Sequence, residues 1–148
     1  MSTTKPPMAQ ILVVDDEKDI RELLRLMLEA DGYRVMQASD GREALPLALK
    51  HPIDLIITDI RMPKLDGLTL CKALRQNKDT AHIPVLIVAG QTTAEPLKEA
   101  WDAGADEFLS KPFNPYEIKL RVRTLVRLKQ AHDEIRKLRG HSAATPTS

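Results

Sequence analysis

The chain has 148 residues, a length typical of one domain, and its 43% hydrophobic and 29% charged residues are ordinary for a soluble globular protein. Its net charge of +1 provides no global field that would select nucleic acid or a membrane surface. The single cysteine, Cys71, excludes an internal disulfide and fits a reducing compartment. Residues 1–7 lack the apolar core of a secretory signal, and no apolar run reaches membrane-spanning length. We therefore expect a cytoplasmic domain without a membrane segment.

Five short apolar runs alternate with five amphipathic segments along the chain. The runs are rich in Ile, Val and Leu, which predicts buried strands at residues 11–14, 33–38, 53–58, 83–88 and 105–109. Apolar residues at helical spacing predict helices at residues 20–29, 39–50, 67–76, 92–103 and from 114 past 138. This alternation predicts an α/β fold, with a five-stranded parallel sheet, helices on both faces and right-handed crossovers.

Local signals predict helix ends and core positions. Ser39 and Asp40 are suited to cap the second helix, and residues 92–95 match a capping box for the fourth. Pro46 falls inside the second helix and should kink or shorten it. Cys71 stands at a core-facing helical position and is expected to be buried. Trp101, the only tryptophan, is expected to pack against the fold, and an exposed interaction surface is the alternative.

Three of the predicted strands end in charged residues. The first ends in Asp15 and Asp16, the third in Asp59 and the fifth in Lys111. Because ligands bind beyond the carboxyl ends of parallel strands, these groups are expected to meet at one edge of the sheet. Three clustered carboxylates repel one another, and a hard divalent cation such as Mg²⁺ would relieve that repulsion. A carboxylate, a metal and an ammonium group are the parts needed to accept a phosphoryl group.

These residues carry a resemblance to the receiver domain of bacterial two-component response regulators, over about residues 9–128. The matching pieces are residues 13–17 (VVDDE), 58–63 (TDIRMP), 66–67 (DG), 103–106 (AGAD) and 111–113 (KPF). Each piece is weak alone, but the set in this order is highly specific. The resemblance implies a flavodoxin-like fold with strand order 2-1-3-4-5. It also implies a cis peptide bond between Lys111 and Pro112.

The same resemblance implies a role for each charged residue. Asp59 would be the phosphoacceptor. Asp16 and Asp59 would bind Mg²⁺ directly, together with the backbone carbonyl of Arg61, while Asp15 would act through a water molecule. Lys111 would pair first with Asp59 and then with the phosphoryl group. The domain would be a signalling switch that catalyses only its own phosphorylation and dephosphorylation, and it would not be an enzyme in the metabolic sense.

One position departs from the family pattern. After the fourth strand the family has Ser or Thr followed by a small residue, whereas this chain has Ala89 followed by Gly90. The hydroxyl that would bind a phosphoryl oxygen is therefore absent, and a hydrogen bond to a charged group contributes roughly 1.5–3 kcal/mol. Residues 91–93 are candidates to compensate. The aromatic switch position of the fifth strand is Phe108. We hypothesise that Asp59 is phosphorylated but that its coupling to the output surface is weakened or rerouted.

The expected domain organisation is a flexible tail at residues 1–8, a receiver domain at 9–128, and a helical extension with a disordered tail at 129–148, the polar tail beginning at His141. Apolar residues of the extension follow three- and four-residue steps that suit a short coiled coil: Leu128, Ala131, Ile135 and Leu138. A dimer or a signalling helix leading to an output domain is one interpretation, and a solvated extension is the other. The last helix is basic, but no base-reading signal favours nucleic acid.

Two functions compete for the whole chain. In the first, a histidine kinase or phosphotransfer protein phosphorylates Asp59, which changes partner binding or homodimerisation through the last helix or the face of the fourth and fifth strands. A C-terminal output domain would lie outside this chain. In the second, the chain is a phosphate-independent binding module, as Ala89 suggests. A metal-dependent phosphatase would need an acid two residues after Asp59, where the chain has Arg61.

Individual residues also have simpler interpretations. Asp15 and Asp16 could only cap the following helix, since acidic residues favour helix N-termini. Asp59 could be a turn residue, and Lys111 could be a solvated surface lysine.

Overall fold

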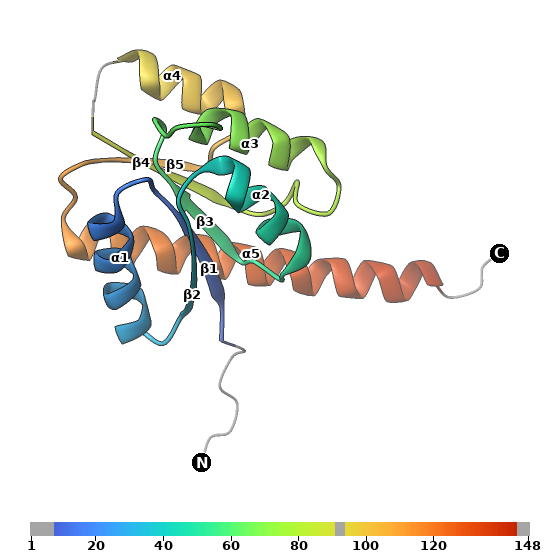
Figure 1. Ribbon diagram of the computed structural model, residues 1–148. Helices are drawn as coiled ribbons and strands as arrows, with labels where there is room; N and C mark the ends of the chain where they lie inside the picture. The colour runs from blue at the N-terminus through green and yellow to red at the C-terminus, as the bar shows by residue number, and fades with distance from the viewer. Residues whose placement is uncertain (1–7, 91–93, 145–148) are drawn as a thin grey trace.

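The computed structural model describes residues 8–90 and 94–144, which form five strands and five helices. The strands are β1 (Gln10–Val14), β2 (Arg34–Ala38), β3 (Leu55–Thr58), β4 (Val85–Ala89) and β5 (Glu107–Ser110). The helices are α1 (Lys18–Ala30), α2 (Gly41–Lys50), α3 (Gly67–Gln76), α4 (Ala94–Ala103) and α5 (Pro115–Ala144). All neighbouring strands are parallel, in the order β2-β1-β3-β4-β5 (Figure 1). The predicted α/β fold and strand order are confirmed.

Alternate residues of the central strands supply two separate cores. On one face of the sheet, Leu12 of β1, Ile56 of β3 and Ile87 of β4 pack in a cluster with residues of α2, α3 and α4. On the other face, the intervening strand residues, such as Val13 and Leu86, pack with residues of α1 and α5. Figure 1 shows the same two layers of helices around the sheet. Strands buried on both faces read as continuous apolar runs, which explains why the sequence pattern located them.

Aspartates cap two of the helices. The Asp40 carboxylate accepts a hydrogen bond from the backbone N–H of Glu43, which begins α2 as the sequence predicted. Asp66 accepts one from the N–H of Thr69 at 2.8 Å and begins α3. Pro46 does not shorten α2, which continues to Lys50. The capping box expected for α4 depends on residues 92 and 93, which lie outside the described residues.

Arg75 joins the starts of β4 and β5, at the edge of the sheet opposite the charged strand ends. Its guanidinium donates to the carbonyl oxygens of Gly104 at 3.0 Å and Ile83 at 2.7 Å. It also pairs with the Asp106 carboxylate at 2.8 Å, and the same carboxylate accepts a hydrogen bond from the N–H of Val85. One side chain from α3 thereby holds the turn before β5 against the start of β4.

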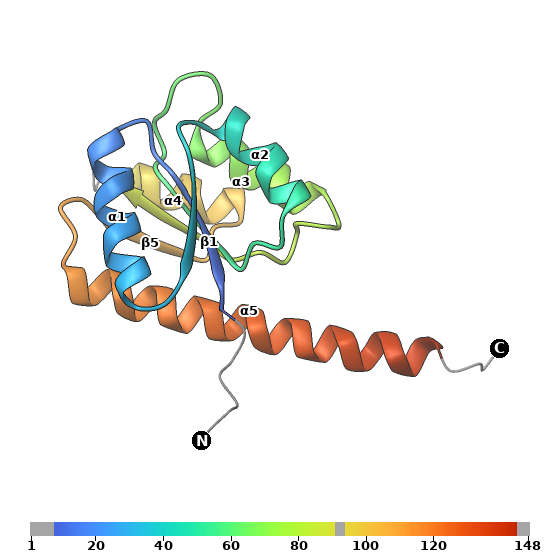
Figure 2. The ribbon, with the colours of Figure 1, turned by 60° about the horizontal axis from the view of Figure 1, so that its bottom comes forward.

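The last helix continues well past the rest of the fold, as Figure 2 shows. It ends at Ala144 and so includes His141, where the sequence predicted a disordered tail to begin. The terminal segments 1–7 and 145–148, also expected to be disordered, lie outside the described residues. The large apolar side chains of the expected seam are exposed: Leu128 (57%), Ile135 (48%) and Leu138 (64%). No helix in the described part of the chain is long and apolar enough to cross a membrane.

Side chains on two elements attach this extension to the body. The Lys129 ammonium is buried and lies 3.7 Å from the Asp54 carboxylate at the start of β3. One turn further on, the His132 ring stacks on His82, with ring centroids 5.1 Å apart. Arg136 contacts Nε2 of the same His82 at 3.0 Å. Burial, together with the positive charges of Lys129 and Arg136, lowers the pKa of His82, so the neutral ring that accepts this hydrogen bond is favoured.

Trp101 contradicts the expected packing, because 81% of it is exposed. The neighbouring residues Ala100 and Ala103 occupy the face of α4 that meets the core. Trp101 follows Ala100 by one residue, so its side chain is rotated about 100° away from that face. Cys71 is fully buried, as the sequence predicted.

Gly67 provides a stability test close to the charged edge. A Cβ atom at this position would lie 1.9 Å from the backbone oxygen of Asp59, which a real structure does not tolerate. We expect Gly67→Ala to lower the free energy of unfolding in urea by at least the roughly 1–3 kcal/mol that overpacking costs. Gly90→Ala is the matched control, since a Cβ there meets no atom within 4 Å. Equal losses in the two variants would contradict this account.

Candidate functional site

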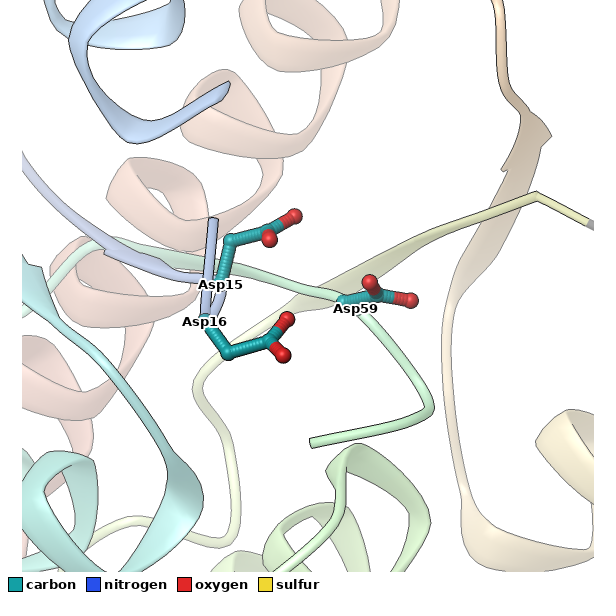
Figure 3. A group of neighbouring side chains, drawn as sticks. All are labelled: Asp15, Asp16 and Asp59. Atoms are coloured by element: carbon teal, nitrogen blue, oxygen red, sulfur yellow. The ribbon is translucent and has the colours of Figure 1, made fainter. Parts of the chain in front are cut away.

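The charged edge lies where β1 and β3 end side by side. Val14 and Thr58 are paired in the parallel register, so the residues that follow them leave the sheet together. The N–H of Asp59 still donates to the carbonyl of Val14 at 3.0 Å, which fixes its backbone to β1. Figure 3 shows the side chains of Asp15, Asp16 and Asp59 extending from these two strand ends into a common space. The structure therefore brings together the three carboxylates that the sequence predicted to meet.

The three carboxylates form a compact group of oxygen ligands. One oxygen from each of Asp15, Asp16 and Asp59 lies within 4.8 Å of the others. Asp15 is buried, Asp59 is half-buried and Asp16 is exposed, so the group opens to solvent on one side. Hard carboxylate oxygens with room for water are the donors that Mg²⁺ prefers. The residues present thus fit a magnesium ion.

Lys111 is the counter-charge of this cluster. Its ammonium donates to Oδ2 of Asp15 at 2.9 Å and to Oδ2 of Asp59 at 3.0 Å, and only 16% of its side chain is exposed. Burial alone would lower the pKa of Lys111, but the hydrogen bonds and charges of the two carboxylates outweigh it and raise the pKa above 10.5. The ion pairs of Lys111 therefore contribute fully to the stability of the fold at neutral pH. This contribution is lost only as the pH rises through the raised pKa of Lys111. Lys111 is not the solvated surface lysine of the simpler interpretation.

Backbone hydrogen bonds orient the two carboxylates that bind Lys111. Oδ1 of Asp15 accepts from the N–H of Glu17 at 2.9 Å, and Oδ1 of Asp59 accepts from the N–H of Ile60 at 2.7 Å. The N-cap of α1 is Glu17, so neither Asp15 nor Asp16 caps that helix, and the hydrogen bond of Asp59 goes to the next residue and does not close a turn. In both residues the local bond uses one oxygen and leaves the other for Lys111. The Lys111–Pro112 peptide bond is cis, as the resemblance implied.

The two expected switch positions lie on the neighbouring strands. Ala89 ends β4 and is buried, and its carbonyl accepts a hydrogen bond from the N–H of Lys111 at 2.8 Å. Phe108 of β5 is half-buried and packs against the core shared with α2, α3 and α4. Residues 91–93, considered as compensating groups, lie outside the described residues.

A cavity of about 250 Å³ opens beside Asp59. Its lining includes Lys111, Ala89 and Arg61, together with Glu99 from α4. Sequence reasoning did not select Glu99, because its position is that of one polar residue among others on an amphipathic helix. A larger cavity of about 660 Å³ lies between Met8, Asp54 and the extension of α5, away from the carboxylate cluster. We assign the chemistry to the smaller cavity because it contains the ordered ion pair.

Comparison with known proteins identifies the family. The family model of the response regulator receiver domain matches residues 11–123 of this chain. Over 120 residues the chain is 42% identical to the DNA-binding dual master transcriptional regulator RpaA of Synechocystis sp., covering 81% of this chain and 50% of RpaA. It is 43% identical over 118 residues to the alkaline phosphatase synthesis transcriptional regulatory protein PhoP of Bacillus subtilis, covering 80% and 48%. The chain thus spans about half the length of these curated relatives.

Solved structures agree with these relatives. The chemotaxis protein CheY4 of Vibrio cholerae superposes with a TM-score of 0.76 and 37% identity, over 80% of this chain and 98% of CheY4. The receiver domain of the Francisella response regulator 1452 superposes with a TM-score of 0.75 and 35% identity, over 80% and 97%. Receiver domains are signalling switches, not enzymes in the usual sense, and they generally bind Mg²⁺ at an acidic pocket. On this evidence the chain belongs to the response regulator receiver domain family of two-component systems.

Proposed function

We propose that this receiver domain accepts a phosphoryl group on Asp59 from a phosphohistidine of a histidine kinase or phosphotransfer protein. The observation that carries the proposal is the position of the Asp59 carboxylate. It is held by Lys111 beside two further carboxylates, and it borders the 250 Å³ cavity from which a donor can approach. Accepting a phosphoryl group is a reaction in which positioning and charge neutralisation provide most of the catalysis.

The transfer is a substitution at phosphorus. A carboxylate oxygen of Asp59 forms a bond to phosphorus as the bond from phosphorus to the imidazole nitrogen breaks, and that nitrogen keeps the electron pair and takes up a proton. The product is an acyl phosphate on Asp59 and a neutral histidine. Hydrolysis reverses the state when a water oxygen attacks phosphorus, which releases inorganic phosphate and restores the carboxylate.

Mg²⁺ would be held by Asp16, Asp59 and the backbone carbonyl of Arg61, with Asp15 acting through a water molecule. When bound, the ion neutralises negative charge on the transferring phosphoryl oxygens. Lys111 supplies the second positive charge. Its ammonium already contacts Asp59 and is placed to bind a phosphoryl oxygen once the acyl phosphate forms.

The downstream effect would be a changed protein surface. Trp101 on α4 and the exposed apolar residues of α5 are candidates for contacts with a partner, a second copy of the chain or an output domain. The curated relatives are about twice as long as the region they share with this chain, and RpaA is named as a DNA-binding regulator. We therefore place a cytoplasmic output domain among the candidate partners.

A second candidate function is a phosphate-independent receiver that only binds partners. The observation in its favour is Ala89, which offers no hydroxyl to a phosphoryl oxygen at the end of β4. The ion pairs of Lys111 with Asp15 and Asp59 oppose it, because a simple binding module gains nothing from a cluster of mutually repelling carboxylates.

Asp16 tests the electrostatic account. Lys111 pairs with the other two carboxylates, so without metal Asp16 adds negative charge to a cluster that is already negative. We expect Asp16→Asn to raise the free energy of unfolding in EDTA by about 0.5–1 kcal/mol at low ionic strength. Added Mg²⁺ should stabilise the wild type and not this variant. Asp79→Asn, in a distant exposed loop, is the control, and a Mg²⁺ response retained by Asp16→Asn would contradict the assignment.

Asp59 tests the phosphoacceptor directly. Incubation of the full chain with acetyl phosphate and Mg²⁺ should add one phosphate to the intact mass of the wild type. Asp59→Asn removes the nucleophilic carboxylate at almost constant size and should show no gain, whereas Asp54→Asn should behave as the wild type. A gain that persists in Asp59→Asn would mean that another residue is the acceptor.

Ala89→Thr separates the two candidate functions. If the domain works through phosphorylation, restoring the hydroxyl adds a hydrogen bond to the charged phosphoryl group, worth roughly 1.5–3 kcal/mol. We expect the acyl phosphate to be retained equally or longer, and the change in association on sizing columns to increase. If the wild type takes no phosphate and Ala89→Thr changes nothing, the phosphate-independent function is favoured.

A further inference from the structure

The cavity beside Asp59 has oppositely charged side chains in its lining. Arg61 follows β3, and Glu99 comes from α4. Both line the same 250 Å³ space as Asp59 and Ala89. Charges that line a space of this size are separated by less than the Debye length, which is roughly 10 Å at 0.1 M salt. Dissolved salt therefore screens their interaction only weakly.

The two cationic side chains of this cavity, Lys111 and Arg61, differ in whether they already form ion pairs with carboxylates. Lys111 is shared between Asp15 and Asp59. Among the side chains that the structure describes, those of residues 8–90 and 97–139, none forms an ion pair with the Arg61 guanidinium. Arg61 is also exposed, so its side chain is free to reorient. It is therefore the cation in the lining that an incoming anion can recruit without breaking an existing ion pair.

A phosphoryl group would change the charge of this space by a large amount. A phosphorylated side chain carries about −1.5 to −2 charges at neutral pH and presents three strong acceptor oxygens. Arg61 would be attracted to those oxygens, and the Glu99 carboxylate would be repelled by them. Ala89 contributes no hydroxyl, and the backbone of Gly90 is unobstructed, since a Cβ there meets no atom within 4 Å.

We propose that Arg61 and Glu99 take the place of the missing hydroxyl in coupling Asp59 to α4. The phosphoryl group recruits the Arg61 guanidinium as an oxygen ligand, and its charge displaces Glu99 and with it α4. This inference rests on the proposed phosphorylation of Asp59. It names the residues through which the rerouted signal reaches the surface that carries Trp101.

Trp101 supplies the measurement. It is the only tryptophan, lies two residues after Glu99 on α4, and is 81% exposed, so its fluorescence reports on the environment of that helix. The full chain is titrated with beryllofluoride in the presence of Mg²⁺, as a stable mimic of the phosphoryl group. Wild type, Glu99→Gln and Arg61→Gln are compared. Two variants are the matched charge controls. Asp102→Asn removes a carboxylate of α4 that pairs with Lys98, and Arg42→Gln removes a cation of α2.

The expected results separate the two roles. The wild type and both controls should show a saturable change in Trp101 emission. Glu99→Gln should bind beryllofluoride at least as tightly but lose more than half of the emission change, because the repulsion is removed. Arg61→Gln should bind about tenfold or more weakly, in line with the loss of a charge-assisted hydrogen bond. Arg61→Lys, which keeps the charge, should recover part of that affinity.

Other results overturn the inference. If Glu99→Gln and Arg61→Gln titrate as the controls do, these residues do not couple the site to α4. If the wild type binds beryllofluoride without any change in Trp101 emission, α4 is not displaced, and the inference fails while phosphorylation at Asp59 stands. If the wild type neither binds beryllofluoride nor gains mass with acetyl phosphate, the proposed function fails and this inference fails with it.

Discussion

The structure depends most on the double contact of Lys111 with Asp15 and Asp59. It requires three strands to end at the same edge of the sheet, because Asp15 follows β1, Asp59 follows β3 and Lys111 follows β5. The register aligns the ends of β1 and β3, where Val14 lies opposite Thr58, and β5 continues to Ser110, opposite Ala89 of β4. A slip of one residue in a strand would turn its side chains to the other face and separate these groups. The two-sided apolar core opposes such a slip, since every residue of β3 and β4 and every residue of β1 after Gln10 is buried.

The same edge is connected to the helices by close backbone contacts. Gly67, the first residue of α3, donates its N–H to the carbonyl of Ile60 at 2.8 Å, one residue after the proposed phosphoacceptor. No larger residue fits there, because the backbone of Asp59 occupies the space of a Cβ atom. On the opposite edge, Arg75 joins α3 to the starts of β4 and β5. The helix α3 thus holds the strands at both ends, and the site is set in a rigid frame.

Sequence reasoning succeeded where burial and strand direction control the structure. The order of elements and the meeting of Asp15, Asp16, Asp59 and Lys111 followed from apolar runs that end in charge. The predicted starts of several strands were too early. Ile53 and Ile83, for example, are buried like strand residues, although they precede the first paired residues of β3 and β4. Sequence reasoning failed at Trp101 because small residues, not the largest one, face the sheet from α4. It did not identify Glu99 because no local pattern marks a helix residue that lines a cavity formed by other elements.

The two faces of the sheet also determine where a signal from Asp59 can travel. Ala89 and Phe108 pack in the core shared with α2, α3 and α4, whereas their neighbours Val88 and Leu109 pack in the core shared with α1 and α5. In the proposed switch, a change at the end of β4 would therefore act first on the core that contains α4. The extension of α5 lies further along a helix that Lys129 anchors to Asp54, at the start of β3 and far from its charged end. On the proposed mechanism, the signal from Asp59 would therefore reach the surface of α4 through one core, whereas a response of the α5 extension would also require the second core to move.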